Sequence, residues 1–352
     1  MIKYIFVCFS VIWPLENVFC QPKPSEAHLR NIRQLTFGGD NAEAYFSFDG
    51  KALAFQSNNP RWGLSCDQIF WMDIEAAASD TLYKPHSVSN GQGRTTCAYF
   101  MKGDEEILFA STYLSGKDCP PPPPPRQDKK YLWQIFDSYD IFVSDLNGQI
   151  VRRLTDSPGY DAEATVSPDG NKIVFTSTRS GDLELWTMDS DGKNPKQITS
   201  GIGYDGGAFF SPDGSKIIFR ASRPQSTEEV SEYKELLSQG LVAPTTMDLY
   251  VCNSDGSNLK KLTSLGKASW APFFHPSGQK IIFSSNHHST RGYDFQLYMI
   301  NLDGTGLEQV TSQSNFNSFA MFSPDGKKLV FASNRNNHGT RDTNIFIADW
   351  VE

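Results

Sequence analysis

The chain has 352 residues, of which 39% are hydrophobic and 13% aromatic, and its formal net charge is −8. This length and composition suffice for one large all-β domain with a substantial core. Because no cluster of lysine or arginine stands out along the chain, we do not expect a surface for nucleic acid or for anionic membranes.

The N-terminal segment predicts export. Lys3 is followed by a mostly apolar run over residues 4–13, and a more polar stretch then ends at Cys20, before Gln21. This order is typical of a cleaved secretory signal peptide over residues 1–20, and the apolar run is too short to span a membrane. A lipid anchor on Cys20 is the alternative, although the residues before it are larger than such a site prefers. We therefore expect a periplasmic or secreted protein.

A turn motif recurs six times along the chain. Proline presets φ in such a turn, aspartate bonds the local backbone, and glycine accepts a positive φ. After each copy come a strand-forming run, a third strand, a second turn that often contains Asp-Gly, and a short fourth strand. The copies of the first turn, of which the one at 101–104 is the most degenerate, lie at residues 47–50, 101–104, 167–170, 211–214, 275–278 and 323–326.

Four strands per unit, repeated six times, predict an all-β fold, the six-bladed β-propeller with four-stranded antiparallel blades. The last unit ends with its third strand at residues 344–350, and residues 32–36 near the N-terminus supply a fourth strand for it. This N-terminal strand completes the last blade and closes the ring without an open sheet edge. We therefore assign residues 21–31 to an N-terminal lead and residues 32–352 to one propeller domain.

The repeat resembles that of a known family. The run Phe-Ser-Pro-Asp-Gly-Lys-Lys-Leu-Val-Phe-Ala-Ser-Asn-Arg at 322–335, together with the Asp-x-Asp-Gly turns that precede Leu-Thr, is similar to the repeat of TolB-like β-propellers. The resemblance covers residues 32–350 and implies the propeller fold. Because this family includes scaffold, binding and enzyme-associated members, and its repeat also occurs in exported peptidases, the resemblance leaves the function open.

The longest insertions gather on one predicted face of the disc. Residues 113–139 include six consecutive prolines at 120–125, and residues 222–247 contain a predicted helix at about 227–239. Ser226 begins that helix with a capping box, and a glycine ends it. The opposite face carries short, uniform turns. Long insertions on one face of a rigid scaffold indicate a binding face, and the alternative is that they only cap the channel.

Charged residues on this face are the candidate site. Because the inter-blade links enter the innermost strands, their side chains should converge on the channel mouth: Glu43, Arg94, Asp161, Glu163 and Asp205. The links between second and third strands add further candidates: Arg179, Arg223, Arg335, His287, His288 and His338. Carboxylates near one axis repel each other unless a cation or an arginine compensates them, so Asp161, Glu163 and Asp205 raise the hypothesis of a site for Ca²⁺ or another hard cation. Alternatively, each acid caps nearby backbone N–H groups.

Four cysteines remain after removal of the predicted signal peptide: Cys66, Cys97, Cys119 and Cys252. In an oxidising compartment they permit three full pairings. A Cys66–Cys97 bridge is the first choice because these residues flank one blade, and buried free thiols are the alternative. No Cys-x-x-Cys pair is present, which argues against a zinc site.

The sequence contains no Gly-x-Ser-x-Gly elbow, no His-Glu-x-x-His pair and no glycine-rich phosphate loop, and no fused catalytic domain is expected. The leading hypothesis is an exported, non-catalytic, monomeric propeller. We expect it to bind an envelope or extracellular protein, a peptide or a saccharide on the face with the long loops. The alternative is a hydrolase or lyase that uses the acids, arginines and histidines at the channel mouth.

Overall fold

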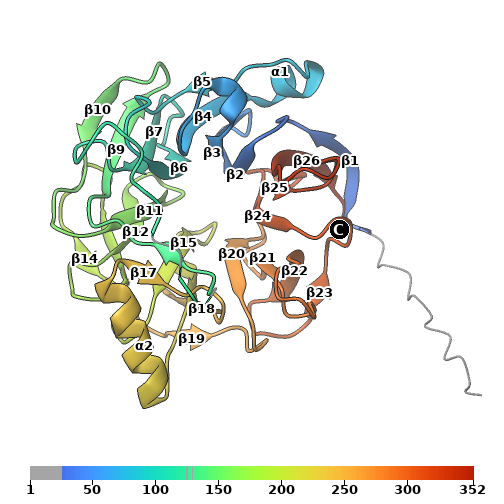
Figure 1. The fold of residues 1–352 in the computed structure, drawn as a ribbon. Coiled ribbons are helices and arrows are strands. Elements are labelled where there is room, and N and C mark those ends of the chain that lie inside the picture. Colours follow the sequence, from blue (N-terminus) through green and yellow to red (C-terminus); the bar gives the residue numbers. More distant parts are fainter. Residues whose placement is uncertain (1–25, 124–125, 129) are drawn as a thin grey trace, which may run out of the picture.

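The computed structural model describes residues 26–123, 126–128 and 130–352. The predicted signal peptide, residues 21–25 of the lead and two prolines of the 120–125 run lie outside these ranges. Six four-stranded antiparallel sheets surround a central channel, which confirms the predicted six-bladed β-propeller (Figure 1). In the described part of the chain, no helix has the length and apolar character needed to cross a membrane.

The strands follow one another from the channel outward in each blade. The first blade contains β2 (Asp40–Phe46), β3 (Ala52–Asn58), β4 (Gln68–Asp73) and β5 (His86–Ser87). The second contains β6 (Thr95–Phe100), β7 (Glu106–Ser111), β9 (Asp140–Asp145) and β10 (Ile150–Arg153). The third contains β11 (Asp161–Val166), β12 (Lys172–Ser177), β13 (Glu184–Asp189) and β14 (Lys196–Gln197). The fourth blade contains β15 (Asp205–Phe210), β16 (Lys216–Ala221), β18 (Asp248–Asn253) and β19 (Lys260–Lys261). The fifth contains β20 (Ser269–Phe274), β21 (Lys280–Ser285), β22 (Gln296–Asn301) and β23 (Glu308–Gln309). The last contains β24 (Asn317–Phe322), β25 (Lys328–Ser333), β26 (Asn344–Trp350) and β1 (Leu29–Gln34).

The N-terminal strand closes the ring as predicted. β1 pairs antiparallel with β26, and the two lie side by side in Figure 1. The strand begins at Leu29, before the expected start at residue 32, because Leu29 is buried and the ring of His28 stacks on that of Trp350 at 4.7 Å. These contacts bring part of the predicted lead into the last blade.

The first turn of each repeat has the chemistry that its sequence predicts. In the last blade, Ser323 Oγ donates to Asp325 Oδ1 at 2.7 Å, Gly326 N donates to Ser323 O at 2.8 Å, and Gly326 adopts a φ of 71°. The degenerate turn of the second blade differs, because Asp104 takes the left-handed position with a φ of 62°. Its carboxylate accepts hydrogen bonds from the backbone N–H groups of residues 48 and 49, so this turn fastens the second blade to the first.

The core lies between the blades and holds their inner strands rigidly. At the centre of every second strand is a phenylalanine that is fully buried: Phe55, Phe109, Phe175, Phe219, Phe283 and Phe331. Burying one such side chain stabilises the fold by about 1.5–3 kcal/mol relative to leaving it exposed. The residue after each phenylalanine therefore has a fixed position on its second strand.

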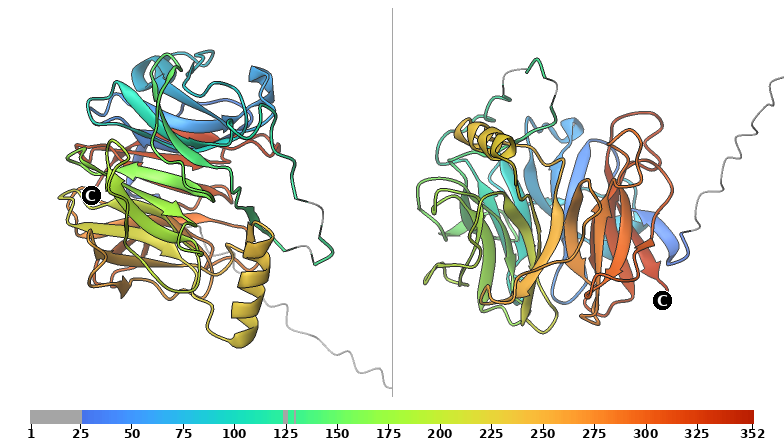
Figure 2. Two further views of the ribbon diagram at one scale, coloured as in Figure 1. Left: turned by 90° about the vertical axis from the view of Figure 1, so that its left-hand side faces the viewer. Right: turned by 90° about the horizontal axis from the view of Figure 1, so that it is seen from below.

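The two largest insertions meet across one face of the disc. The predicted helix is present as α2 (Thr227–Ser238), and its capping box is formed by Ser226 and Glu229. After this helix, β17 (Leu241–Val242) pairs with β8 (Trp133–Gln134) from the second blade's insertion. We call β8 and β17 the cross-blade ribbon. Figure 2 shows α2 and the second blade's loop projecting from the same side of the disc.

The opposite face is less uniform than predicted. In the first blade, the connection between the third and fourth strands contains α1 (Ile74–Ser79), where a short turn was expected. Asp73 caps this helix by accepting a hydrogen bond from the backbone N–H of Ala76, and Ile74 and Ala77 are buried. A short 3-10 helix, η1 (Pro60–Trp62), lies on the long-loop face instead, in the connection between the second and third strands of the first blade. We call the surface of first-to-second turns the turn face.

The cysteines are arranged differently from the first-choice pairing. The four described cysteines are free, so the predicted Cys66–Cys97 bridge is not formed. The Cys66 thiol is in hydrogen-bond contact with that of Cys119 and donates to Gly93 O at 3.1 Å. Gly93 N in turn donates to Lys117 O at 2.9 Å, which holds the segment before Cys119 against the first blade.

We expect oxidised glutathione to join Cys66 to Cys119 in the purified protein. The two thiols lose two protons and two electrons as the S–S bond forms, and the glutathione disulfide is reduced to two thiols. Because the bridge closes a long loop of the unfolded chain, it should raise the free energy of unfolding by up to about 4 kcal/mol. Mass spectrometry of non-reduced peptides identifies the bridge, and Cys66→Ser should remove the gain. A bridge that contains Cys97 would contradict this assignment.

Candidate functional site

The channel is lined by a ring of equivalent residues, one from each blade. Every innermost strand loses its register with the second strand at the same place, as a β-bulge does. One residue of each bulge has a left-handed φ between 46° and 60°: Glu43, Cys97, Glu163, Gly207, Ala271 and Phe319. All of them line one cavity of about 510 Å³. We call this the channel pocket, and its volume falls in the range of small-ligand sites.

The left-handed conformation of these residues belongs to the blade itself. For a residue other than glycine it is disfavoured by roughly 1–2 kcal/mol. Because all six blades share it, the bulge geometry imposes it whatever the side chain. The strand alternation is therefore interrupted where the chain passes the channel, and this turns the bulged side chain toward the axis.

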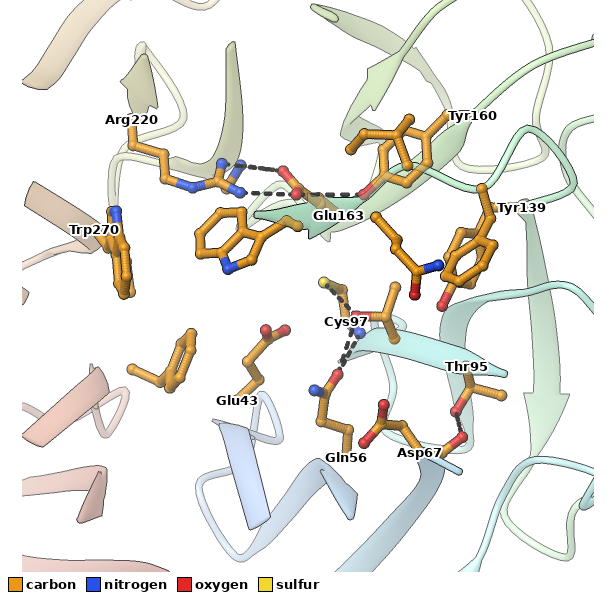
Figure 3. A pocket seen from close by; sticks show the side chains of 18 of the residues that line it. Glu43, Gln56, Asp67, Thr95, Cys97, Tyr139, Tyr160, Glu163, Arg220 and Trp270 are labelled. Atoms are coloured by element: carbon orange, nitrogen blue, oxygen red, sulfur yellow. Dashed lines mark hydrogen bonds and ion pairs between the residues drawn. The ribbon is translucent and has the colours of Figure 1, made fainter. Parts of the chain in front are cut away.

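Glu163 and Arg220 form a buried ion pair at one side of the channel pocket (Figure 3). Arg220 Nη2 lies 2.8 Å from Glu163 Oε1, and Arg220 Nη1 lies 3.2 Å from Oε2. Glu163 also accepts hydrogen bonds from Gly207 N at 2.6 Å, from the Tyr204 hydroxyl and from Thr176 Oγ1 at 3.1 Å. Burial alone would raise the pKa of Glu163, but the Arg220 charge and these donors hold it below its usual value. Glu163 is thus ionised and fully bonded.

Glu43 differs from Glu163 in its ion pairing and in the direction of its pKa shift. In the part of the chain that the structure describes, no basic side chain forms an ion pair with it, and its side chain is hydrogen-bonded to the Cys97 thiol. Burial raises the pKa of Glu43 to about 7, and the nearby Glu163 charge adds to this effect. Figure 3 shows the Glu43 carboxyl group directed into the cavity. Glu43 therefore presents an unpaired carboxyl group to whatever enters the channel pocket.

Aromatic side chains form much of the remaining wall: Tyr139, Tyr160, Tyr204, Trp133, Trp270, Phe136, Phe316 and Phe319. Trp270 is fixed by stacking on Phe295 with ring centroids 4.2 Å apart, and its Nε1 donates to Pro244 O at 2.9 Å. Trp270 is thus held by its own blade and by the fourth blade's insertion.

The cross-blade ribbon covers the channel pocket from the long-loop side. Trp133 of β8 lies 5.1 Å from the guanidinium carbon of Arg220 and 5.1 Å from the ring of Trp270. Ile135 N donates to Gly240 O at 2.7 Å, which ties the second blade's insertion to the fourth blade's. The insertions therefore contribute directly to the pocket wall, as the binding-face prediction requires.

A glycine pair makes room for the Glu163–Arg220 contact. A Cβ atom at Gly206 would lie 2.2 Å from Glu163 Oε2 and 2.5 Å from Arg220 Nη1. We therefore expect Gly206→Ala to displace the ion pair and to lower the free energy of unfolding by about 1–3 kcal/mol. Urea unfolding measures this effect. Gly116→Ala is the matched control because nothing lies within 4 Å of a Cβ atom there, and equal losses in both variants would contradict the expectation.

The structure brings three of the predicted ligand-binding residues to the channel pocket: Glu43, Glu163 and Arg94. Arg94 Nε donates to Asp67 Oδ2 at 3.0 Å, so this charge also has a partner in the pocket wall. The other predicted residues are outside the pocket lining: Asp161, Asp205, Arg179, Arg223 and Arg335.

These five residues form contacts within their own blades. Arg179 Nη2 lies 2.8 Å from Asp161 Oδ2, and Arg223 Nη2 lies 2.8 Å from Asp205 Oδ2. In each pair, the arginine after the second strand bonds the first residue of the innermost strand. Arg335 has the same position in the last blade, where it donates to Asn317 Oδ1 at 3.0 Å and pairs with Glu26 at 3.1 Å.

The arrangement of the acids does not favour the Ca²⁺ prediction. Asp161, Glu163 and Asp205 each pair with an arginine of their own. Within the described ranges, no three histidine, cysteine, aspartate or glutamate side chains gather as a metal centre requires.

The histidines of the long-loop face pack against a tyrosine or lie on a loop. His288 Nδ1 lies 2.8 Å from the Tyr298 hydroxyl, and the ring of His287 lies 4.5 Å from that of Tyr298. Burial lowers the pKa of both histidines. His338 lies on the loop before β26, with a φ of 52°.

Several site residues were missed, above all Arg220, Cys97, Trp133 and Trp270. Arg220 had a detectable signal. It follows the buried phenylalanine of its second strand, where the other blades have small or neutral residues: Gln56, Ala110, Thr176, Ser284 and Ala332. An arginine inside an apolar strand is unusual unless it is paired, and the side chain that pairs with it is Glu163 of the neighbouring blade.

Comparisons with known proteins agree with this architecture. The model of the TolB β-propeller domain family matches residues 133–241. Among curated proteins, the Tol-Pal system protein TolB of Bordetella pertussis (strain Tohama I) is 48% identical over 44 residues. That match covers 12% of this chain and 10% of the relative, so it spans about a tenth of the curated protein.

Two solved structures extend the likeness to most of the chain. TolB from Acinetobacter baumannii has a TM-score of 0.57 at 17% identity, with 87% of this chain and 65% of that chain covered. An oligogalacturonate lyase in complex with manganese has a TM-score of 0.51 at 15% identity, with 91% and 80% covered. At such identities the likeness shows the fold alone. The repeated turns and the six closed blades make the chain a six-bladed β-propeller that is similar to TolB propellers, and its residues 133–241 match the TolB β-propeller family model.

Proposed function

We propose that the protein binds a ligand in the channel pocket, under the cross-blade ribbon, without catalysing its conversion. The observation that carries this proposal is the pairing of charges in an aromatic pocket. Glu163 is bonded to Arg220 and Asp67 to Arg94, which leaves the Glu43 carboxyl group for recognition. Aromatic walls with a few fixed polar groups are typical of binding sites.

The engagement of Glu163 argues against catalysis by the acids. Its two carboxylate oxygens accept hydrogen bonds from Arg220, Tyr204, Thr176 and the backbone of Gly207. A general base or nucleophile must reach the substrate, and these donors occupy the positions from which Glu163 would act.

The alternative is a hydrolase or lyase, and one observation favours it. Glu43 and Glu163 line the same pocket, and their pKa values are displaced in opposite directions. A pair of carboxyl groups separated in this way is typical of an acid and a base in one active site. The propeller of the solved oligogalacturonate lyase supports this alternative at the level of fold only.

The partner that we propose is an envelope or extracellular protein, a peptide or a saccharide, bound by a monomeric propeller. The signal-peptide pattern at residues 1–20 supports export to the periplasm or the medium. Because the cross-blade ribbon covers the channel pocket, a broad partner surface cannot reach it. The position of the pocket therefore supports a partner that inserts a protruding group.

An array of peptides and oligosaccharides, including oligogalacturonates, tests the proposal. Binding is followed by the fluorescence of Trp133 and Trp270, and products are sought by mass spectrometry. Ala271→Phe should fill the channel pocket and abolish binding, and the phenylalanine at the equivalent position 319 indicates that the bulge accepts it. Lys327→Phe places the same ring on the turn face as a control. Binding that survives Ala271→Phe contradicts the site, and turnover that Glu43→Gln abolishes establishes the alternative.

A further inference from the structure

The charges that line the channel pocket do not cancel. Its aspartate, glutamate, lysine and arginine residues are Glu43, Asp67, Arg94, Glu163 and Arg220. The two arginines form ion pairs with Asp67 and Glu163. An ionised Glu43 is therefore left as one unbalanced negative charge in the channel pocket.

The walls suit a positive charge as well. Arg220, which is part of the protein, already lies over two of these rings, 4.6 Å from the centroid of Tyr204 and 5.1 Å from that of Trp133. Trp270 also faces the cavity. Aromatic faces attract cations, and the attraction is stronger away from water.

We propose that the channel pocket takes an organic cation, an ammonium or guanidinium group, which pairs with Glu43 between the aromatic rings. This inference rests on the proposed binding function and names the chemistry of the group that enters the pocket. Such a group is offered by a lysine or arginine side chain of a peptide, by a peptide N-terminus, or by an amine on a saccharide. A metal ion is a poorer occupant because the described residues gather no set of ligands around Glu43.

Binding of the cation should depend on pH through Glu43. The groups that face Glu43 are Cys97 on β6, Glu163 on β11, Arg220 on β16, Asp67 before β4, and Tyr45 on its own strand. Burial raises the pKa of the Cys97 thiol and of Tyr45, so both remain neutral near pH 7. Glu163 and Arg220 remain charged as a pair, and Asp67 is paired with Arg94.

Glu43 is therefore the group in this set that changes charge around neutrality, since its pKa is about 7. A cation binds to the ionised form, so affinity should be constant above this pH. Below it, affinity should fall about tenfold for each pH unit, because the proton competes with the ligand.

Three probes of similar shape test the inference by calorimetric titration of the purified protein. They are 2-phenylethylamine, which is cationic, 2-phenylethanol, which is neutral, and phenylacetate, which is anionic. At pH 8 we expect the cation to bind at least tenfold more tightly than the neutral probe, and the anion to bind more weakly than both. Glu43→Gln should remove the preference for the cation and retain the affinity for 2-phenylethanol.

The control is Glu105→Gln, which removes an exposed carboxylate beside the turn face and should leave the preference unchanged. Equal affinities for the three probes, a preference for the anion, or no binding of the cation overturns the inference. These results leave the proposed function standing if array ligands are still lost in Ala271→Phe. The proposed function fails separately if array ligands bind equally to the native protein and to Ala271→Phe.

Discussion

Arg220→Leu is expected to lower the free energy of unfolding by about 3–5 kcal/mol, the usual effect of leaving one partner of a buried ion pair unpaired. Arg220 is 7% exposed and Glu163 is 9% exposed at the side chain, so Glu163 would lose its ionic partner in a poorly hydrated position. The variant also loses the stacking of Arg220 on Tyr204 and Trp133. Urea unfolding at pH 7 measures the change.

The double variant Glu163→Gln with Arg220→Met distinguishes the effect of an unpaired charge from the effect of lost packing. It replaces both charges with neutral side chains of similar size, and such replacements are often close to neutral for stability. We therefore expect it to recover most of the loss. A double variant as unstable as Arg220→Leu would show that the charge pair is not the cause.

The second large effect is a pH-dependent stabilisation by Glu43→Gln. The pKa of Glu43 is about 7 in the folded protein and 4.5 without its environment, so the folded state holds this proton more tightly. The corresponding stability is complete below pH 4.5 and is lost as the pH rises through 7. At pH 8 the native protein should have lost about 2–3 kcal/mol, which the glutamine variant retains.

Urea unfolding at pH 5 and pH 8 measures this difference between the two proteins. We expect nearly equal stability at pH 5 and a more stable variant at pH 8. Glu105→Gln, with its exposed side chain, should differ little from the native protein at either pH. A Glu43→Gln variant that is less stable than the native protein at pH 8 would contradict the assignment of an unpaired buried carboxyl group. A residue that weakens the fold at neutral pH is more readily explained by function than by stability.

The fold could be predicted because its signals are local. Each first turn is specified by a few adjacent residues, as in Ser323, Asp325 and Gly326, and the spacing of these turns counts the blades. The missing fourth strand of the last unit predicts the closing strand near the N-terminus. Its start was set too late because the contact between His28 and Trp350 joins the two ends of the chain.

The site was predicted only in part because its geometry is not local. The strand alternation alone does not show which residue of an innermost strand faces the axis, since the bulge at Glu43 or Glu163 interrupts it. The pairing of β8 with β17 joins insertions from two blades and brings Trp133 over the channel. Arginines such as Arg179 were assigned to a ligand because sequence position gives their face and not their partner, which is Asp161.

The central claim is that the channel pocket admits an external, positively charged group beside Glu43. Cys97 lies next to Glu43 in the ring, so its reaction with small thiol reagents reports directly on that space. A methanethiosulfonate reagent forms a disulfide with the Cys97 sulfur, and methanesulfinate is the leaving group.

The most direct measurement is the rate at which Cys97 of the folded protein reacts with 2-aminoethyl and with 2-sulfonatoethyl methanethiosulfonate at pH 8. The label is located by peptide mass spectrometry, and each rate is normalised to the unfolded chain. We predict that the cationic reagent reacts at least tenfold faster than the anionic one and that Glu43→Gln removes most of this difference. A folded protein in which Cys97 reacts with both reagents at the same normalised rate, or faster with the anionic one, would contradict the claim.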